Sequence, residues 1–241
     1  MTNKQTAYLV RNIWRYVKYR WKNEINIYFI SGMCYNCSVF DGLKLPSGYR
    51  KKYLKWYVPR PDESLEEYSR TLAKEIDTTR PFVLVGYSFG GIIVQEMGKF
   101  LSPVKIIIIS SFKSDEEIPM LFKAAKRLNV AERIPPRMYA STELITEIFN
   151  RLVYHVASEE LSQVMTFTHP VYIKWAIYQI TNWIPHGSKH IYHIHGTEDQ
   201  IFSYTLLHNV FPIEGGDHLM VMKKADVVSS IISSILLMKE K

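Results

Sequence analysis

Apolar residues along the chain occur either in short continuous runs or at helical spacing. Short runs rich in β-branched side chains predict buried strands at 25–30, 82–85, 104–109 and 191–195, and further strands are expected at 53–58 and 208–213. Helical spacing is found at 64–77, 92–101 and 223–238. Because strands alternate with helices, the sequence predicts an α/β fold with a mostly parallel central sheet.

A long segment of helical pattern interrupts this alternation. Residues 113–185 contain the helix breakers Pro119, Pro135-Pro136 and Pro170 and no strand-like run comparable to those before and after them. We interpret this segment as a helical cap inserted into one α/β domain that spans residues 1–241. Its large apolar residues suggest a pocket for an apolar acyl or aromatic group, although such residues more often form a core; they include Phe149, Met165, Trp175 and Trp183.

Positive charge is concentrated at the start of the chain. The formal net charge is +7, but the first 22 residues hold six cations and no acid, which leaves 24 basic and 23 acidic groups for the rest. This nearly neutral remainder argues against a nucleic-acid partner. Residues 5–22 predict a basic amphipathic helix that packs on its own domain, with weak peripheral contact to an anionic membrane as the alternative.

Neither a membrane-spanning segment nor a secretory signal is expected. The apolar runs fall short of the roughly 18 residues that a transmembrane helix needs, and the start of the chain has no apolar core before a small-residue cleavage site. We therefore expect a cytoplasmic protein. Its two cysteines, Cys34 and Cys37, are interpreted as reduced thiols in a loop, because a zinc site would need a second pair of ligands at suitable spacing.

The segment Gly86-Tyr87-Ser88-Phe89-Gly90 matches the pattern G-x-S-x-G. It lies between a predicted strand and a stretch of helical spacing, which is the setting of a nucleophile elbow, a tight strand-to-helix turn that presents a serine. Glycines on both sides leave room for the backbone to approach closely, so the serine hydroxyl can project above the edge of the sheet. Ser88 is therefore the candidate nucleophile.

A serine of ordinary pKa is a poor nucleophile and needs a neighbouring base that a third group orients. Among eight histidines, His218 is the candidate base, because it lies in the loop before the last predicted helix and follows the serine in the chain. The carboxylates of Glu198 and Asp199 both follow the strand predicted at 191–195. The residues alone leave either of them open as the orienting acid.

An acyl-transfer site also needs preorganised hydrogen-bond donors for the oxyanion of the tetrahedral intermediate. Two backbone N–H groups are candidates. Phe89 directly follows the nucleophile, and Met33 lies in the loop after the first predicted strand. Both are assigned by position, since a backbone donor depends little on its own side chain.

Four segments together resemble the α/β-hydrolase superfamily, in particular its small bacterial members with a helical cap: Ser31-Gly32-Met33, Gly86 to Gly91, His195 to Asp199 and Gly215 to His218. The resemblance covers about residues 25–238. It implies a triad of Ser88, Asp199 and His218, hydrolysis through an acyl-enzyme, and neither a metal nor an organic cofactor. The chain departs from many relatives in carrying Ser31 where they have histidine, and the usual antiparallel edge strands are not expected.

The sequence thus predicts a carboxylesterase-like serine hydrolase with a small-molecule substrate, an ester or thioester that is cleaved through an acyl-enzyme on Ser88. Because the same fold hosts enzymes that hydrolyse amides or C–C bonds, these reactions are alternatives. A protein that keeps the fold and binds a ligand without catalysis is a further alternative.

Overall fold

The computed structural model describes residues 24–133, 163–186 and 191–238. Their strands form a sheet in the order β2-β1-β3-β4-β5-β6, and each pairing between neighbours is parallel. No antiparallel edge strand flanks this sheet within the described ranges. The strands are β1 (Ile25–Ile30), β2 (Tyr49–Leu54), β3 (Phe82–Tyr87), β4 (Lys105–Ile109), β5 (Ile191–Gly196) and β6 (Val210–Ile213).

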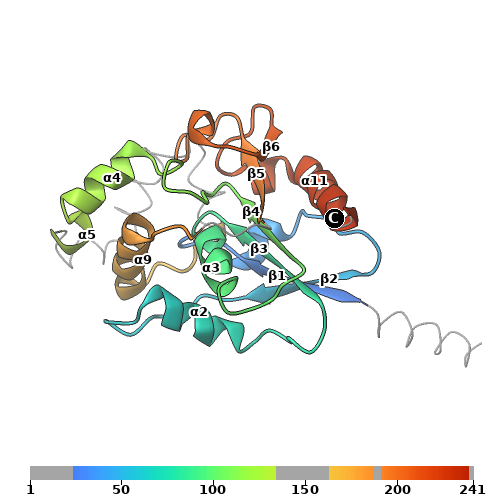
Figure 1. The fold of residues 1–241 in the computed structure, drawn as a ribbon, viewed down its shortest axis with the longest axis horizontal. Helices are drawn as coiled ribbons and strands as arrows, with labels where there is room; N and C mark the ends of the chain where they lie inside the picture. Colours follow the sequence, from blue (N-terminus) through green and yellow to red (C-terminus); the bar gives the residue numbers. More distant parts are fainter. Residues whose placement is uncertain (1–23, 134–162, 187–190, 239–241) are drawn as a thin grey trace, which may run out of the picture.

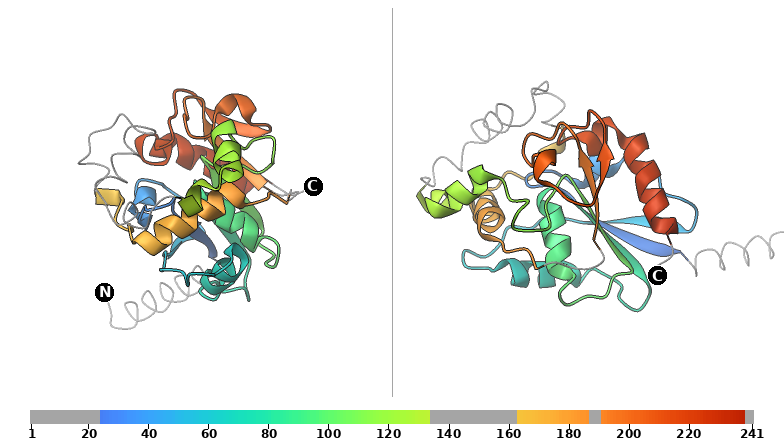
Figure 2. Two further views of the ribbon diagram at one scale, coloured as in Figure 1. Left: turned by 90° about the vertical axis from the view of Figure 1, so that its left-hand side faces the viewer. Right: turned by 45° about the horizontal axis from the view of Figure 1, so that its top comes forward.

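Helices cover both faces of the sheet, as Figure 1 and Figure 2 show. On one face α2 packs against α3, which contacts β1, β3 and β4, and on the other α11 packs over β5 and β6. With both faces covered, β3 and β4 are buried along their whole length, which explains their apolar sequences. The helices are α2 (Leu65–Ala73), α3 (Phe89–Met97), α10 (Met220–Lys223) and α11 (Ala225–Leu237), with the 3-10 turns η1 (Cys37–Phe40) and η3 (Tyr204–Leu206).

The strand predicted at 53–58 is misplaced. The observed strand β2 lies four residues earlier and pairs in parallel with β1, with Ile25 opposite Tyr49 and Ile30 opposite Leu54. β2 is an edge strand, and most of its side chains are half-buried or exposed, including Lys51 and Lys52. An edge strand needs no continuous apolar run, which is why the prediction fell on the more apolar segment 53–58.

The other elements lie within a few residues of their predicted positions. The helix expected at 64–77 has the predicted capping box, in which Ser64 Oγ accepts from the Glu67 N–H and Glu67 Oε2 accepts from the Ser64 N–H. This helix ends at Ala73 rather than Asp77. The next three N–H groups donate to carbonyls only three residues back, so the chain tightens into turns.

In the described part of the segment between β4 and β5, three helices form a group of their own beside the sheet (Figure 1). They are α4 (Met120–Arg127), α5 (Val130–Arg133) and α9 (Pro170–Asn182). They contact one another, and α9 also contacts α3. This arrangement agrees with a helical cap in the region predicted for it. Its residues Met165, Trp175 and Trp183 are buried in the hydrophobic core.

Some predictions fall on residues outside the described ranges. These are the basic amphipathic helix at 5–22 and the stretch 134–162 of the cap, which includes Phe149. Within the described ranges, none of the helices combines the length and the apolar composition needed to cross a membrane.

Candidate active site

Ser88 lies in the turn between β3 and α3, with backbone angles of φ 52° and ψ −118°. A positive φ is costly for any residue with a side chain, about 1–3 kcal/mol, and is held here by the surrounding backbone. The Ser88 N–H donates to Ile109 O at 2.8 Å, and the Ser88 carbonyl accepts from Gly91 N–H at 2.8 Å. A Cβ on Gly90 would lie 2.2 Å from Ile30 O, so this turn tolerates no larger residue there.

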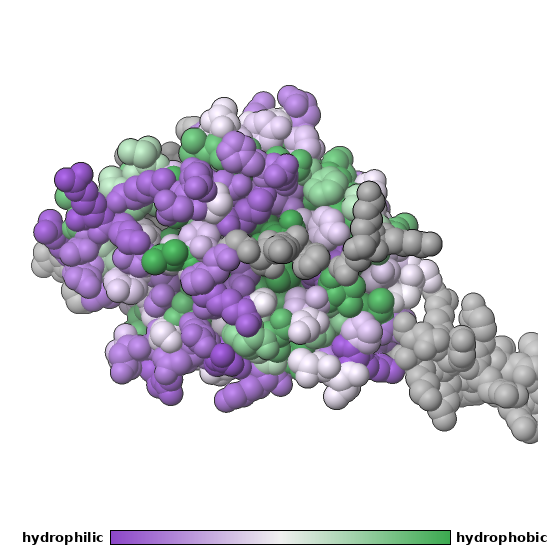
Figure 3. Space-filling model, in the orientation of Figure 1, coloured by the Kyte–Doolittle hydropathy of each residue, from purple (hydrophilic) through white to green (hydrophobic). Residues whose placement is uncertain are grey.

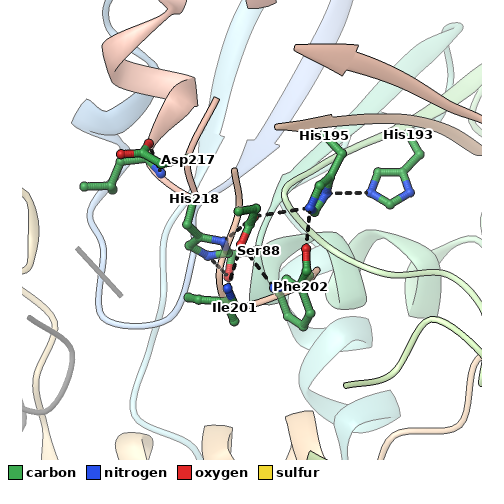
Figure 4. Close-up of polar contacts among 9 residues, drawn as sticks. Ser88, His193, His195, Ile201, Phe202, Asp217 and His218 are labelled. Atoms are coloured by element: carbon green, nitrogen blue, oxygen red, sulfur yellow. Dashed lines mark hydrogen bonds and ion pairs between the residues drawn. The ribbon is translucent and has the colours of Figure 1, made fainter. Parts of the chain in front are cut away.

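Three predicted site residues meet at the carboxyl ends of β3 and β5 (Figure 4). The Nε2 atom of His218 lies 3.0 Å from Ser88 Oγ, and its Nδ1 lies 2.8 Å from Asp199 Oδ2. Because the carboxylate can only accept, Nδ1 carries the proton and the hydroxyl donates to Nε2. The side chains of Asp199 and His218 are buried, whereas Ser88 is half-buried. The hydroxyl is thus placed where a base can remove its proton.

Asp199 is held on both of its carboxylate oxygens. While Oδ2 faces His218, Oδ1 accepts from the backbone N–H groups of Ile201 at 2.9 Å and Phe202 at 3.1 Å. Burial by itself would raise the pKa of Asp199, but the charge and hydrogen bond of His218, the nearby His195 and the Phe202 N–H together hold that pKa below its ordinary value. The carboxylate therefore stays ionised at neutral pH. The alternative acid, Glu198, is exposed.

Two buried histidines lie behind the acid, a feature that the sequence reasoning missed. His193 Nε2 lies 3.2 Å from His195 Nδ1, and His195 Nε2 lies 2.8 Å from Phe202 O and 3.3 Å from Asp199 Oδ2 (Figure 4). At its other end His193 Nδ1 lies 3.4 Å from Lys113 Nζ. Because an ammonium group only donates, Lys113 favours the tautomers in which each imidazole accepts at Nδ1 and donates from Nε2 toward the acid loop. The Ser111 backbone also hydrogen-bonds the His193 ring.

A cavity of about 530 Å³ opens beside Ser88 and His218. Its described lining residues come from α3, α4, α5, α9 and the loops after β1, β3, β5 and β6, and none of them is Lys, Arg, Asp or Glu. The outer surface of the molecule is more polar than this lining: over α4 and α5 it is mostly hydrophilic (Figure 3). The cavity thus offers an apolar group a place to bind; its apolar lining includes Phe122, Leu128, Ile177, Ile180, Ile201 and Phe202.

Comparisons with known proteins give matches among solved structures but none among family models or curated proteins. A thermophilic esterase from Thermogutta terrifontis matches with a TM-score of 0.65 at 15% identity, over 89% of this chain and 90% of that chain. An alpha/beta hydrolase fold protein from Burkholderia ambifaria matches with a TM-score of 0.62 at 11% identity, over 88% and 90%. This chain has the α/β-hydrolase fold.

A further α/β-hydrolase-fold match is MenH from S. aureus, with a TM-score of 0.66 at 15% identity over 88% of this chain and 93% of that chain. All three matches span most of both chains at low identity. They therefore establish the fold, which is shared by proteins of different activities, and leave the reaction to be argued from the site.

Within the α/β-hydrolase fold, both predicted oxyanion donors lie at the cavity. Phe89 is the first residue of α3, and Met33 lies in the loop after β1; each lines the cavity together with Ser88. Ser31 donates its hydroxyl to Tyr35 O at 2.7 Å. This bond closes the loop that carries Met33.

Other candidate chemistry lies away from this arrangement. Cys34 and Cys37 are free thiols, and burial raises the pKa of Cys34 to about 12 and that of Cys37 to about 11. Protonated thiols are weak nucleophiles and weak metal ligands. In the part of the chain that the structure describes, no group of three or more His, Cys, Asp or Glu side chains is arranged to hold a metal ion. Of the aromatic cap residues, Trp175 and Trp183 are buried and are not among the cavity-lining residues.

Proposed function

We propose that this protein is a serine hydrolase that cleaves an ester or thioester with an apolar acyl group. Ser88 is the nucleophile, His218 the general base and Asp199 the acid that orients it. One observation carries the proposal: hydrogen bonds run from Asp199 Oδ2 through the imidazole to Ser88 Oγ, at the wall of an apolar cavity. That constellation is recognised by its geometry, whatever the fold that presents it.

Acylation begins when Ser88 Oγ attacks the acyl carbon and its proton passes to His218 Nε2. The carbonyl oxygen becomes an oxyanion, which the N–H groups of Met33 and Phe89 stabilise. When the tetrahedral intermediate collapses, the bond to the leaving oxygen or sulfur breaks, and His218 returns the proton to that atom. The acyl group is now esterified to Ser88.

Deacylation repeats these steps with water as the nucleophile. His218 takes a proton from the water as its oxygen attacks the acyl carbon, and then donates that proton to Ser88 Oγ as the ester bond breaks. The products are a carboxylic acid and the free enzyme. Asp199 stays ionised throughout, because it stabilises the imidazolium that forms in each half of the reaction.

The cavity indicates the chemical class of the acyl group. An apolar chain in it would contact the aliphatic and aromatic side chains of α4 and α9, whereas a charged chain would find no Lys, Arg, Asp or Glu on the described wall. Small-molecule esters and thioesters of apolar acids are thus the proposed substrates.

Covalent labelling with a fluorophosphonate tests the nucleophile. We expect intact mass spectrometry to show one adduct on wild-type protein, and no adduct on Ser88→Ala, because only a serine activated by a neighbouring base reacts readily with this probe. Ser230→Ala is the matched control, since Ser230 is exposed on α11, and it should label like wild type.

Turnover of p-nitrophenyl esters, followed by the absorbance of the released p-nitrophenolate, should disappear in Ser88→Ala and persist in Ser230→Ala. Folded wild-type protein that neither labels nor turns over any ester would overturn the proposal. Binding of an apolar ligand to such a protein, without chemical change, would favour the ligand-binding alternative.

A further inference from the structure

Trp56 lies just after β2, in the segment that sequence analysis assigned to a strand. Its side chain is buried, and its indole Nε1–H donates to the carbonyl oxygen of Gly32 at 3.1 Å. The same oxygen accepts from the backbone N–H of Tyr35, also at 3.1 Å. Trp56 therefore fixes a backbone group in the loop after β1, and the pattern of the sequence offered no sign of this contact.

That backbone group belongs to the peptide unit that also contains the Met33 N–H. A trans peptide is planar, so its C=O and N–H point in opposite directions. Holding the Gly32 oxygen on the indole thus turns the Met33 N–H away from Trp56. The unit lies directly beside the nucleophile, since a Cβ built on Gly32 would be 3.2 Å from Ser88 Cβ.

The same indole packs on the second proposed oxyanion donor. The rings of Trp56 and Phe89 are stacked, with their centroids 5.4 Å apart and their planes 12° apart. The indole also contacts Tyr172 of α9, at 5.5 Å between ring centroids. One rigid side chain thereby contacts both segments whose N–H groups are proposed to bind the oxyanion.

We propose that Trp56 is a positioning residue of the oxyanion site, which orients the Gly32–Met33 peptide through its hydrogen bond and supports Phe89 through stacking. This inference rests on the proposed function. Trp56 touches no reacting atom, and it acts through the two backbone donors. Preorganised donors matter because they are aimed at the charge before the reaction begins.

The test compares two replacements of the indole. Trp56→Phe keeps an aromatic ring but removes the N–H, and replacement by the sulfur isostere benzothienylalanine keeps the size of the ring system and removes only the donor. Trp183→Phe is the matched control, because Trp183 is also buried and donates its indole N–H, to Glu96 Oε2 at 2.9 Å, away from the cavity lining. Thermal unfolding checks that each variant is folded.

We expect kcat to fall about tenfold in both Trp56 variants with KM changed less than about twofold, a smaller loss than the roughly 10²–10³ for outright removal of an oxyanion donor. The inhibition constant of an alkyl trifluoromethyl ketone, whose adduct with Ser88 carries an oxyanion, should rise by the same factor as kcat falls. Trp183→Phe should keep the wild-type kcat and inhibition constant.

Three results would overturn this role. The first, in an active wild-type background, is an unchanged kcat in the benzothienylalanine variant. The second is an equal fall of kcat in Trp183→Phe, which would show that the effect comes from loss of core packing in general. The third is a wild-type protein that shows no labelling and no turnover, because the proposed function then fails first. The first two outcomes leave the serine-hydrolase proposal intact, so the two failures are distinguishable.

Discussion

Ser88 and Asp199 illustrate how single residues are prepared for their proposed roles. Ser88 keeps a strained backbone because the neighbouring strand and helix leave no alternative, and its hydroxyl is thereby directed at His218. Asp199 remains charged although it is buried, since each of its oxygens accepts hydrogen bonds or faces an imidazole. Strain and buried charge are both unfavourable for folding, which is typical of functional sites.

Asp199→Asn should lower kcat by about 10³–10⁴ with little loss of folding, because the amide would orient the imidazole with the wrong nitrogen protonated. Steady-state kinetics on the ester that wild type cleaves best would measure this loss. Glu198→Gln is the matched control, since Glu198 is the adjacent carboxylate and is exposed. A larger loss in Glu198→Gln than in Asp199→Asn would show that the acid is assigned to the wrong residue.

At the scale of elements, β5 does more than complete the sheet. Because side chains two apart point to the same side of a strand, His193 and His195 stand next to each other and lead toward the acid loop that follows β5. Burial lowers the pKa of both histidines, most strongly for His193, so both are neutral in the folded protein. The strand and the loop thus depend on two uncharged imidazoles.

Protein stability should therefore fall as the pH falls below the unfolded-state pKa of histidine, about 6.5. Below that pH these histidines take up protons in the unfolded chain but stay neutral in the folded protein. Above it they are neutral in both states, so they contribute no pH dependence. Each buried histidine can add at most about 1.4 kcal/mol per pH unit to the slope. Urea unfolding at a series of pH values between 7.5 and 5 measures this slope.

Replacing either buried histidine, as His193→Gln or His195→Gln, should flatten the slope. His208→Gln is the control because His208 is exposed, and it should keep the wild-type dependence. A free energy of unfolding that stays constant from pH 7 to pH 5 in wild type would contradict the assignment of neutral buried imidazoles.

On the scale of the whole molecule, the cavity exists because helices from separate parts of the chain come together over the sheet. Its wall combines α3, which follows the nucleophile, with α4 and α9 from the region between β4 and β5. The proposed catalytic groups and the cavity wall thus come from different parts of the chain, an arrangement common in sites outside the carboxyl ends of parallel strands.

For straight-chain esters, kcat/KM should rise by up to about fourfold for each added CH₂ group, since burying one contributes roughly 0.8 kcal/mol, until the cavity is filled. Assays of p-nitrophenyl esters of increasing acyl length measure this series. Ala125→Phe, which adds a ring to the cavity wall, should move the optimum to shorter chains, whereas Lys126→Phe on the neighbouring exposed position should not. A flat series in wild type would contradict acyl binding in this cavity.

The local sequence was sufficient to predict most elements and the turn around Ser88. Buried strands such as β1 and β4 were predictable because a strand covered on both faces must be apolar throughout, and the capping box at Ser64 and Glu67 depends only on residues three apart. The edge strand β2 was misplaced because its exposed side chains carry no such constraint. The N-terminal helix and the site roles remain predictions.

The tertiary structure alone decided which distant groups meet. Either carboxylate after β5 satisfied the chain order, but only the folded loop directs Asp199 at His218 and leaves Glu198 in solvent. Likewise, nothing near Trp56 in the sequence indicates that its indole reaches Gly32, or that His193 and His195 form a hydrogen-bonded chain to the acid. Contacts of this kind depend on sheet order and crossovers, whereas sequence patterns record only periodicity and the preferences of neighbouring residues.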